Sequence, residues 1–558
     1  MKRIALILIV SVSLLSSCDE FLTTYPVDAM SPATTWNNAR DAEAFLIGIY
    51  SNWYSAHETF NLENTSDIGY GFHVHEGWQL FGNGRMNSSG TQQVSFYDFS
   101  NIRRAGYFLS RIDDVDMDET VKQDMIAQAR FLRAWRYFRM NWWFGGVPII
   151  ELPSSAEEAQ VPRSTEAQVK QFIYDEIDLA LEGINLAPSA AGFVGRGAVL
   201  ALKMRTALFY EDWQRSLNAA REIVGLGQYS LHPDFTELFS YAGRNSPEII
   251  LAHQRIFPGA AVGMVQFPNN VDGGWSSMVP TWNLIDLYET ADGLTIDECP
   301  SYDPEFPFYN RDPRMAMTVA FPGMDWTWGG RHYRDVLNTL DREIPTTPDP
   351  TTNENYPPRA NNASKTGLTW AKYLLPYSQF PAGFDNQHVN FIVFRYAEVL
   401  LSLAEASNEL HGPSDEVYDA LDAIRERAGM PDVDRVRHNT KETLRELIRR
   451  ERSVELAGEG LRRQDIVRWR DSDGRMVAET VLNRPLMRRT GTIDYDETDQ
   501  YRRARITGET LIENRTFEPH MRFMPFHQGH LDRNPYLLQN RGYAPDSEVV
   551  PPDWYIRR

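Results

Sequence analysis

DMIAQARFLRAWRYFRMNWWFGGVP, residues 124–148, is the stretch that decides the fold. Residues spaced by four and three share one face of a helix, and here they are Ala127, Phe131, Ala134, Phe138 and Asn141. Small alanines alternate with phenylalanines on this face, so a second helix can approach closely and pack between the rings. We therefore predict a core helix inside a helical scaffold, ended by the Gly145-Gly146 pair before Pro148.

The same helix carries a second apolar ridge and four arginines. The ridge contains Leu132, Trp135 and Trp142, and the arginines are Arg130, Arg133, Arg136 and Arg139. A functional interpretation makes the aromatic rings a ligand platform and the arginines an anion site. We favour the structural interpretation, in which the arginine stems cover apolar surface and the guanidinium groups meet carboxylates.

Composition limits the class of protein. The chain has 558 residues, 42% of them hydrophobic and 24% charged, which is typical of a folded protein too long for one simple core. Its net charge of −20 repels phosphate backbones, so we expect no nucleic-acid partner.

The N-terminus has the pattern of a targeting segment. Lys2 and Arg3 precede an apolar run over residues 4–15, which is too short to span a bilayer. The sequence LSSC then ends at Cys18 and resembles a bacterial lipobox, so we expect residues 1–17 to be removed and Cys18 to be acylated. The alternative is an ordinary secretory signal followed by an incidental cysteine.

Cleavage before Cys18 would remove two positive charges and take the net charge from −20 to −22. Several acyl chains on one cysteine anchor a protein stably. Asp19 and Glu20 follow directly and resemble the surface-export signal of Bacteroidetes lipoproteins, which implies the outer face of the outer membrane. The second cysteine, Cys299, has no cysteine left to pair with.

Helical periodicity divides the mature chain into three regions, 18–230, 231–393 and 394–558. The first and third are predicted to contain paired helices of similar size joined by short turns, which suggests tetratricopeptide-like hairpins. The middle region is rich in proline, glycine and aromatic residues, and we predict short strands there, for example over residues 314–321. After residue 471 we expect mainly loops.

Ten segments, ordered along the chain, resemble the SusD/RagB family of Bacteroidetes outer-membrane lipoproteins. They are the lipobox at Cys18, ARFLRAWRYFRMNWWFGGVPI from Ala129, VPRST from Val161, RGAVLALKMRTALFYEDW from Arg196, SPEIILA from Ser246, RDPRM from Arg311, FRYAEVLLSLAEASNE from Phe394, AIRERAGM from Ala423, IRRERSVELAGEGLRRQDIVRW from Ile448 and NPYLLQNRGY from Asn534.

The resemblance implies a mainly α fold of about four tetratricopeptide-like hairpins with irregular loops packed on it. It also implies a function: binding an oligosaccharide or polysaccharide at the cell surface and passing it to a SusC-like TonB-dependent transporter. No cofactor and no catalysis are expected.

Two irregular, aromatic-rich regions are the candidate binding loops, since aromatic rings cover the apolar face of a sugar and polar side chains bind its rim. The candidates in residues 55–100 are Trp78, Asn83 and Arg85, with Asp67 behind them; those in the middle region are Trp275, Trp326 and Trp328. For each tryptophan, packing against the scaffold is the alternative. Arg85 or Arg331 could meet an acidic sugar, whereas the alternative for each, which we favour, is a solvated or paired arginine.

Competing chemistries have weaker signals. His73 and His75 in the sequence HVH would share one side of a strand, but no further metal ligands stand nearby, so we predict no metal site. The sequence contains no G-x-S-x-G nucleophile elbow, no H-E-x-x-H zinc-protease motif, no phosphate-binding loop and no dinucleotide-binding fingerprint. The remaining alternatives are a peptide-binding lipoprotein of the RagB type and a surface glycoside hydrolase.

Overall fold

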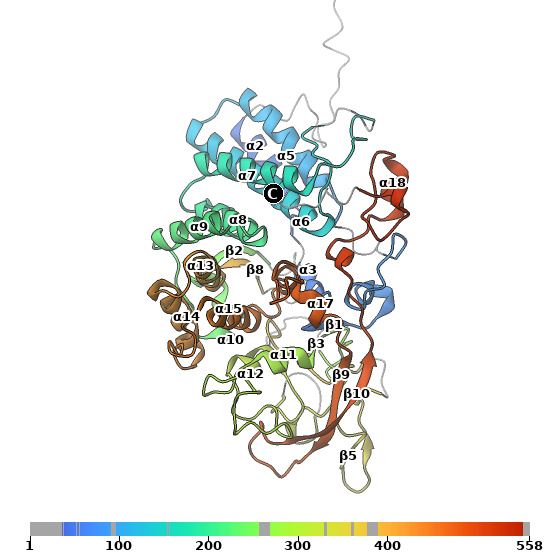
Figure 1. The fold of residues 1–558 in the computed structure, drawn as a ribbon. Coiled ribbons are helices and arrows are strands. Elements are labelled where there is room, and N and C mark those ends of the chain that lie inside the picture. The colour runs from blue at the N-terminus through green and yellow to red at the C-terminus, as the bar shows by residue number, and fades with distance from the viewer. Residues whose placement is uncertain are drawn as a thin grey trace, which may run out of the picture.

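The computed structural model describes residues 36–550, apart from residues 37, 52, 55, 91–95, 153–154, 156, 256–267, 328–331, 359–361 and 376–388. It is mainly helical, as the sequence predicts. Helix pairs are stacked above one another, and a loop-rich region with short strands closes the lower end (Figure 1). The predicted signal segment, Cys18, Trp328 and Arg331 lie outside the described residues.

Four helices form the upper part of the scaffold: α2 (Ala39–Tyr50), α5 (Ser100–Arg111), α6 (Glu119–Phe144) and α7 (Glu166–Gly183). Local capping signals set where they begin. The side chain of Asp118 accepts from the Val121 N–H at the start of α6, and Thr165 forms a capping box with Gln168 at the start of α7.

The lower part of the scaffold continues the stack. It contains α8 (Arg196–Phe209), α9 (Trp213–Gly225), α13 (Tyr396–His411), α14 (Asp415–Ala428), α15 (Lys441–Glu455) and α16 (Arg462–Arg468). Helix α9 contacts both α8 and α13, and α13 contacts α14 and α15, so the N-terminal and C-terminal helices build one continuous scaffold (Figure 1). The predicted hairpin arrangement is confirmed.

Helix α6 is the core helix that its sequence predicts. All five residues of the Ala/Phe face are buried, and so are the three residues of the second ridge. Gly145 ends the helix in the left-handed conformation with φ 64°, where a Cβ would also meet the Phe523 ring 2.6 Å away. A side chain at this position would therefore strain both the helix end and its packing.

The arginines of α6 take the predicted structural role. Arg130 and Arg133 both bind the Glu176 carboxylate of α7 at 2.7 Å, and Arg136 lies 3.7 Å from Asp98. The Arg139 guanidinium lies over the Phe96 ring, 5.1 Å from its centroid. These contacts join α6 to its neighbours and assign the helix to the scaffold.

The middle of the chain forms a second hydrophobic core beneath α15. Its elements are short: α10 (Phe235–Leu238), β2 (Ile249–His253), β3 (Met278–Pro280), α11 (Trp282–Leu287), α12 (Arg314–Thr318), β4 (Val319–Ala320), β5 (Glu343–Ile344), β6 (Thr351–Thr352), β7 (Thr369–Trp370) and β8 (Phe391–Arg395). The strand predicted over residues 314–321 is wrong in its first part, because Arg314–Thr318 is helical. The exact borders of the three predicted regions stay a prediction.

The chain after residue 471 holds more regular structure than its sequence indicates. Strands β9 (Leu486–Ile493) and β10 (Ala504–Glu513) form an antiparallel hairpin, which α17 (Val477–Val481) precedes and α18 (Gln528–Arg533) follows in the sequence. The prediction of a loop-rich segment did not include this hairpin. The base of the hairpin packs through Leu486 on β1 (Gly69–Gly71) and β3.

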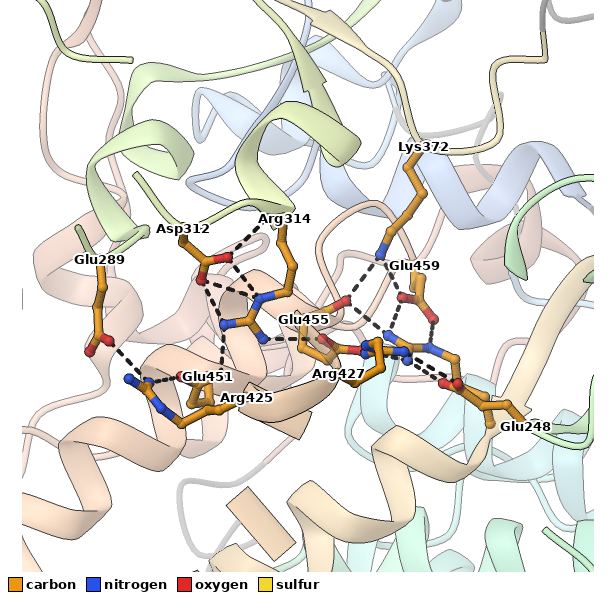
Figure 2. A network of polar contacts seen from close by, with 11 residues as sticks. Glu248, Glu289, Asp312, Arg314, Lys372, Arg425, Arg427, Glu451, Glu455 and Glu459 are labelled. Atoms are coloured by element: carbon orange, nitrogen blue, oxygen red, sulfur yellow. Dashed lines mark hydrogen bonds and ion pairs between the residues drawn. The ribbon is translucent and has the colours of Figure 1, made fainter. Parts of the chain in front are cut away.

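A buried ion network fastens the loop-rich region to the scaffold (Figure 2). Arg314 of α12 binds Asp312 at 2.7 Å and Glu455 of α15 at 3.1 Å, while Lys372 binds Glu459 at 2.8 Å. Arg395, at the end of β8, binds Glu455 at 2.7 Å. Glu451 and Glu455 of α15 thus make ion pairs that hold the fold together.

No helix in the described part of the chain is long and apolar enough to cross a membrane.

Candidate functional site

The two predicted binding regions meet at a short antiparallel ladder. Strand β1 from the first region pairs with β3 from the second, with Tyr70 opposite Val279. Residues 72–76, which include the 3₁₀ turn η1 (Val74–Glu76), follow β1, while the loop over residues 268–277 precedes β3. The ladder therefore places the two irregular segments side by side, although about 200 residues separate them in the sequence.

Among the predicted tryptophans that the structure describes, Trp275 is the one that solvent reaches. Its exposed fraction is 42%, and Val74, on the neighbouring segment, is 67% exposed. The backbone of Trp275 lies next to the His73 ring, so the two segments are neighbours. Large exposed apolar side chains are typical of a binding surface.

The loop that carries Trp275 is held from below by Asp272. The Asp272 carboxylate is buried and accepts from Trp326 Nε1 at 2.8 Å, while His332 Nε2 lies 2.9 Å from its other oxygen. The Ser276 N–H donates to the Pro268 carbonyl at 3.1 Å and closes the loop. At Gly274 a Cβ would lie 2.1 Å from that same oxygen, so the turn requires glycine.

Polar and basic groups cluster on the neighbouring segment, next to Phe72. The Phe72 and His73 ring centroids are 3.9 Å apart, those of His73 and His75 are 5.2 Å apart, and Lys365 Nζ lies 4.8 Å from the Phe72 centroid. We call Phe72, His73, His75, Trp275 and Lys365 the Trp275 surface. Burial lowers the pKa of His73, and His75 lowers it further, so the neutral imidazole is favoured as a hydrogen-bonding group.

Four other predicted residues lie inside the protein. Trp78, 8% exposed, packs on Phe81 and Phe96, while Asn83 is buried and donates to Glu513 at 3.0 Å. The carboxylate of Asp67 forms a two-bond pair with Arg462, both bonds at 2.8 Å.

Burial alone raises the pKa of Asp67, but Arg462 outweighs it and holds the pKa below its usual range. Trp326 is buried as the donor to Asp272, whereas Arg85 is exposed at the surface. Of the four buried residues, Trp326 supports the Trp275 loop through Asp272. Among the predicted tryptophans that the structure describes, Trp275 is the exposed one.

The sequence did not single out Phe72 or Lys365, and it treated His73 and His75 only as a metal pair. In the described residues, no group of three His, Cys, Asp or Glu side chains could hold a metal ion. Nothing local to Lys365 marks it, because its place beside Phe72 depends on the tertiary fold.

A separate cavity of about 880 Å³ opens between α5 and α18. Its walls include Tyr97, Phe99, Arg103, His530 and Arg533, and none of its lining residues belongs to the Trp275 surface. No residue predicted from the sequence as a ligand contact lines this cavity.

The family comparisons cover most of the chain. The model described as "SusD family" matches residues 253–543, which is more than half of the chain, and the model described as "Starch-binding associating with outer membrane" matches residues 28–192. A SusD-like protein of Formosa agariphila is 24% identical over 502 residues, which is 83% of this chain and 90% of the relative.

Solved structures agree. A SusD-like carbohydrate-binding protein of Bacteroides fragilis is 26% identical with a TM-score of 0.76, over 90% of this chain and 99% of that one. Surface glycan-binding protein A of Bacteroides uniformis shares the fold, with a TM-score of 0.66 at 19% identity, over 90% of this chain and 99% of that one. The family resemblance seen in the sequence is thus confirmed, and the chain belongs to the SusD family.

Proposed function

We propose that this protein is a cell-surface lipoprotein that captures glycan at the Trp275 surface, without cleaving it, and delivers it to a SusC-like TonB-dependent transporter. The observation that carries the proposal is the exposed Trp275 ring, held on a fixed loop beside polar groups. A similar protein of 26% identity described as carbohydrate-binding supports the ligand class.

The surface suits a sugar for a physical reason. A pyranose ring presents C–H groups on its face and hydroxyl groups around its rim. A flat indole can cover the face, while imidazole and ammonium groups bind hydroxyl oxygens at the rim. Because Asp272 and the ladder fix the loop, little ordering entropy opposes binding.

The proposal of a non-catalytic role is supported by how the nearby carboxylates are used. Glycoside hydrolysis needs two carboxyl groups at a set separation, one of which transfers a proton. Asp272 beneath Trp275 is buried and already bonded to Asn269, Trp326 and His332. Asp272 therefore serves to hold the Trp275 loop in place.

The cellular place is proposed from the N-terminal sequence and the family. Cys18 would be the lipid attachment site, with Asp19 and Glu20 directing export to the outer face. The family model that matches residues 28–192 is itself described as associating with the outer membrane. Metabolic labelling with palmitate should label the wild type and not Cys18→Ser; a labelled Cys18→Ser would contradict the lipid attachment site. Protease added to whole cells should digest the wild type; a wild type protected from the protease would contradict the surface location.

The glycan proposal is tested by affinity electrophoresis against a panel of polysaccharides. We expect at least one polysaccharide to retard the wild type and to retard Trp275→Ala far less. Tyr309→Ala is the matched control, because Tyr309 is a similarly exposed ring, 45% accessible, outside the Trp275 surface. Retention of peptides and of no glycan would overturn the ligand class, and release of new reducing ends from any panel member would overturn the non-catalytic role.

Delivery to a transporter is tested separately by affinity purification of the tagged full-length chain from membranes. An outer-membrane TonB-dependent receptor should copurify in near-stoichiometric amount. Its absence under conditions that retain the lipid anchor would contradict this part of the proposal.

A further inference from the structure

The cavity of about 880 Å³ between α5 and α18 shares no lining residue with the Trp275 surface and has no part in the proposed function. Its volume lies in the range of about 300–1,000 Å³ that is typical of small-molecule sites. Long-range hydrogen bonds fix both walls. The Asn101 side chain of α5 donates to the Ile49 carbonyl at 3.0 Å, and Asn534, directly after α18, donates to the Val161 carbonyl at 2.9 Å. The cavity is therefore built into the fold.

Aromatic rings line this cavity. The Tyr97 ring packs edge-to-face on Phe144 and Phe526, with centroid distances of 5.7 and 5.2 Å, and its centroid lies 4.7 Å from that of His530. Phe99 stands edge-to-face to Tyr97 at 5.1 Å. Tyr97 and Phe99 are both partly exposed and both line the cavity, so the ring cluster is open on that side. A further planar ring can join it there at an ordinary aromatic distance.

Positive side chains outnumber negative ones in the described lining. Arg103, Arg104 and Arg533 line the cavity, whereas Asp532 is the one acidic residue among the described lining residues. Arg104 has a partner, because its Nη1 donates to the Gly48 carbonyl at 2.9 Å. The guanidinium groups of Arg103 and Arg533 make no hydrogen bond or ion pair with any described residue. Two guanidinium groups in one cavity are thus available to an anion.

The surroundings distinguish these two arginines from arginines on an open surface, which water solvates. They share their cavity with the aromatic rings and with Ile102 and Ile150. A hydrogen bond to a charged group is stronger beside apolar walls than in bulk water. Asp532 does not neutralise them, because its Oδ1 accepts from Gln528 Nε2 at 2.9 Å and it makes no ion pair with a described residue. The chain as a whole has a net charge of −20, so this local excess of positive charge stands against the overall charge.

We propose that the cavity between α5 and α18 is a second binding site, which takes a small aromatic carboxylate. The aromatic ring of the ligand packs against Tyr97 and Phe99, and its carboxylate accepts hydrogen bonds from the guanidinium groups of Arg103 and Arg533. The fork of a guanidinium matches the two oxygens of a carboxylate. Gln160 also lines the cavity, and its amide can bind a hydroxyl group on the ligand ring.

The test measures affinity by calorimetry with the full mature chain. The probes are benzoate, 4-hydroxybenzoate and 4-hydroxycinnamate, together with the methyl ester of each and with cyclohexanecarboxylate. We expect at least one aromatic carboxylate to bind about tenfold more tightly than its methyl ester, because the ester lacks the charge that the arginines bind. Cyclohexanecarboxylate should bind several-fold more weakly than benzoate, because its saturated ring cannot pair with the aromatic cluster.

Arg103→Gln and Arg533→Gln should each weaken binding of the aromatic carboxylate about tenfold and leave binding of its ester unchanged. Both arginines are exposed, so the urea midpoint of each variant should equal that of the wild type. Arg111→Gln is the matched control: it removes a positive charge from the other end of α5, where Arg111 pairs with Asp114 at 3.5 Å, roughly 12 Å along the helix from Arg103. Its affinity should equal that of the wild type.

Trp275→Ala separates the two sites, because it should leave binding of the aromatic carboxylate unchanged. If no aromatic carboxylate binds, or if the esters bind as tightly as the acids, this proposal is overturned and the proposed function stands. If Trp275→Ala abolishes the binding and the two arginine variants do not weaken it, the probe occupies the Trp275 surface and the second site is also overturned. Failure of the polysaccharide panel would overturn the proposed function and leave this site standing.

Discussion

Replacing Glu455 by glutamine should destabilise this protein more than almost any other single-atom exchange in it. Glu455 is fully buried, and its carboxylate contacts Arg314, Arg395 and Arg427 at the centre of the network in Figure 2. Burial alone would raise the pKa of Glu455, but Arg427, Arg395 and Arg314 outweigh it and hold the pKa well below its usual range. The charge is therefore present in the folded protein at neutral pH.

The magnitude follows from what the substitution leaves behind. Glutamine keeps the shape and one acceptor oxygen but removes the negative charge, so three buried guanidinium groups lose part of their compensation. Removing one partner of a buried ion pair costs about 3–5 kcal/mol. Stability as a whole is about 5–15 kcal/mol. The variant should therefore lose a large fraction of it.

Urea unfolding followed by circular dichroism measures this loss as a fall in the midpoint at unchanged slope. Glu416→Gln is the control, because Glu416 pairs with Arg221 at 2.7 Å on the exposed side of the scaffold and should cost less than about 1 kcal/mol. If Glu455→Gln costs no more than Glu416→Gln, the network does not hold the loop-rich region to the scaffold and this reasoning fails.

Three further substitutions test other parts of the structure. Phe138→Ala empties a site in α6 where the ring is 1% exposed and should cost about 3–5 kcal/mol in urea unfolding; a cost below 1 kcal/mol would show that the helix repacks freely. Trp326→Phe removes the Nε1 donor to Asp272 and should lower stability by about 1.5–3 kcal/mol and weaken glycan binding through the loop, whereas unchanged stability would show that this bond is not the anchor. Burial raises the pKa of Glu63 to about 7, against the opposing bond from the Gly460 backbone, so the folded carboxyl holds its proton more tightly than the unfolded one. The stabilisation from the tightly held proton of Glu63 is complete below about pH 4.3 and is lost as the pH rises through 7. Glu63→Gln should therefore flatten the fall in urea midpoint between pH 5 and 8. An equal fall in both proteins would contradict the raised pKa of Glu63.

The scaffold could be predicted from sequence because its signals are local. Helix α6 ends at the predicted Gly145, and α7 begins after Thr165, whose side chain caps it locally. Helix α13 begins only at Tyr396, because Phe394 and Arg395 belong to β8 and pair with β2. Helical periodicity and helix caps depend on residues that are close in the sequence, whereas strand pairing depends on residues that are distant in it.

Long-range pairing explains the elements that sequence did not reveal. The β9–β10 hairpin is joined by residues 494–503, a connection much longer than the two-residue turns that mark hairpins in a sequence. Residues Arg314–Thr318 form α12 in place of the predicted strand, and Arg314 at its start is bound by Asp312, Glu451 and Glu455. The carboxylates of Glu451 and Glu455 come from α15, so nothing in the local sequence of five residues indicates these contacts.

The candidate site was predictable by region and not by residue. The two aromatic-rich stretches do meet, at β1 and β3. Trp78 and Trp326 are buried and Trp275 is exposed, yet nothing in their neighbouring sequence distinguishes the three rings. Lys365 reaches the Phe72 ring from a segment about 290 residues further along the chain, so only the fold places the two side chains together.

A crystal structure of the protein with a glycan that it retains is the most direct test of the central claim. The account predicts a sugar ring stacked on Trp275, with carbon atoms about 4 Å from the indole. A glycan found instead in the cavity lined by Tyr97 and Phe99, with Trp275 untouched, would contradict it.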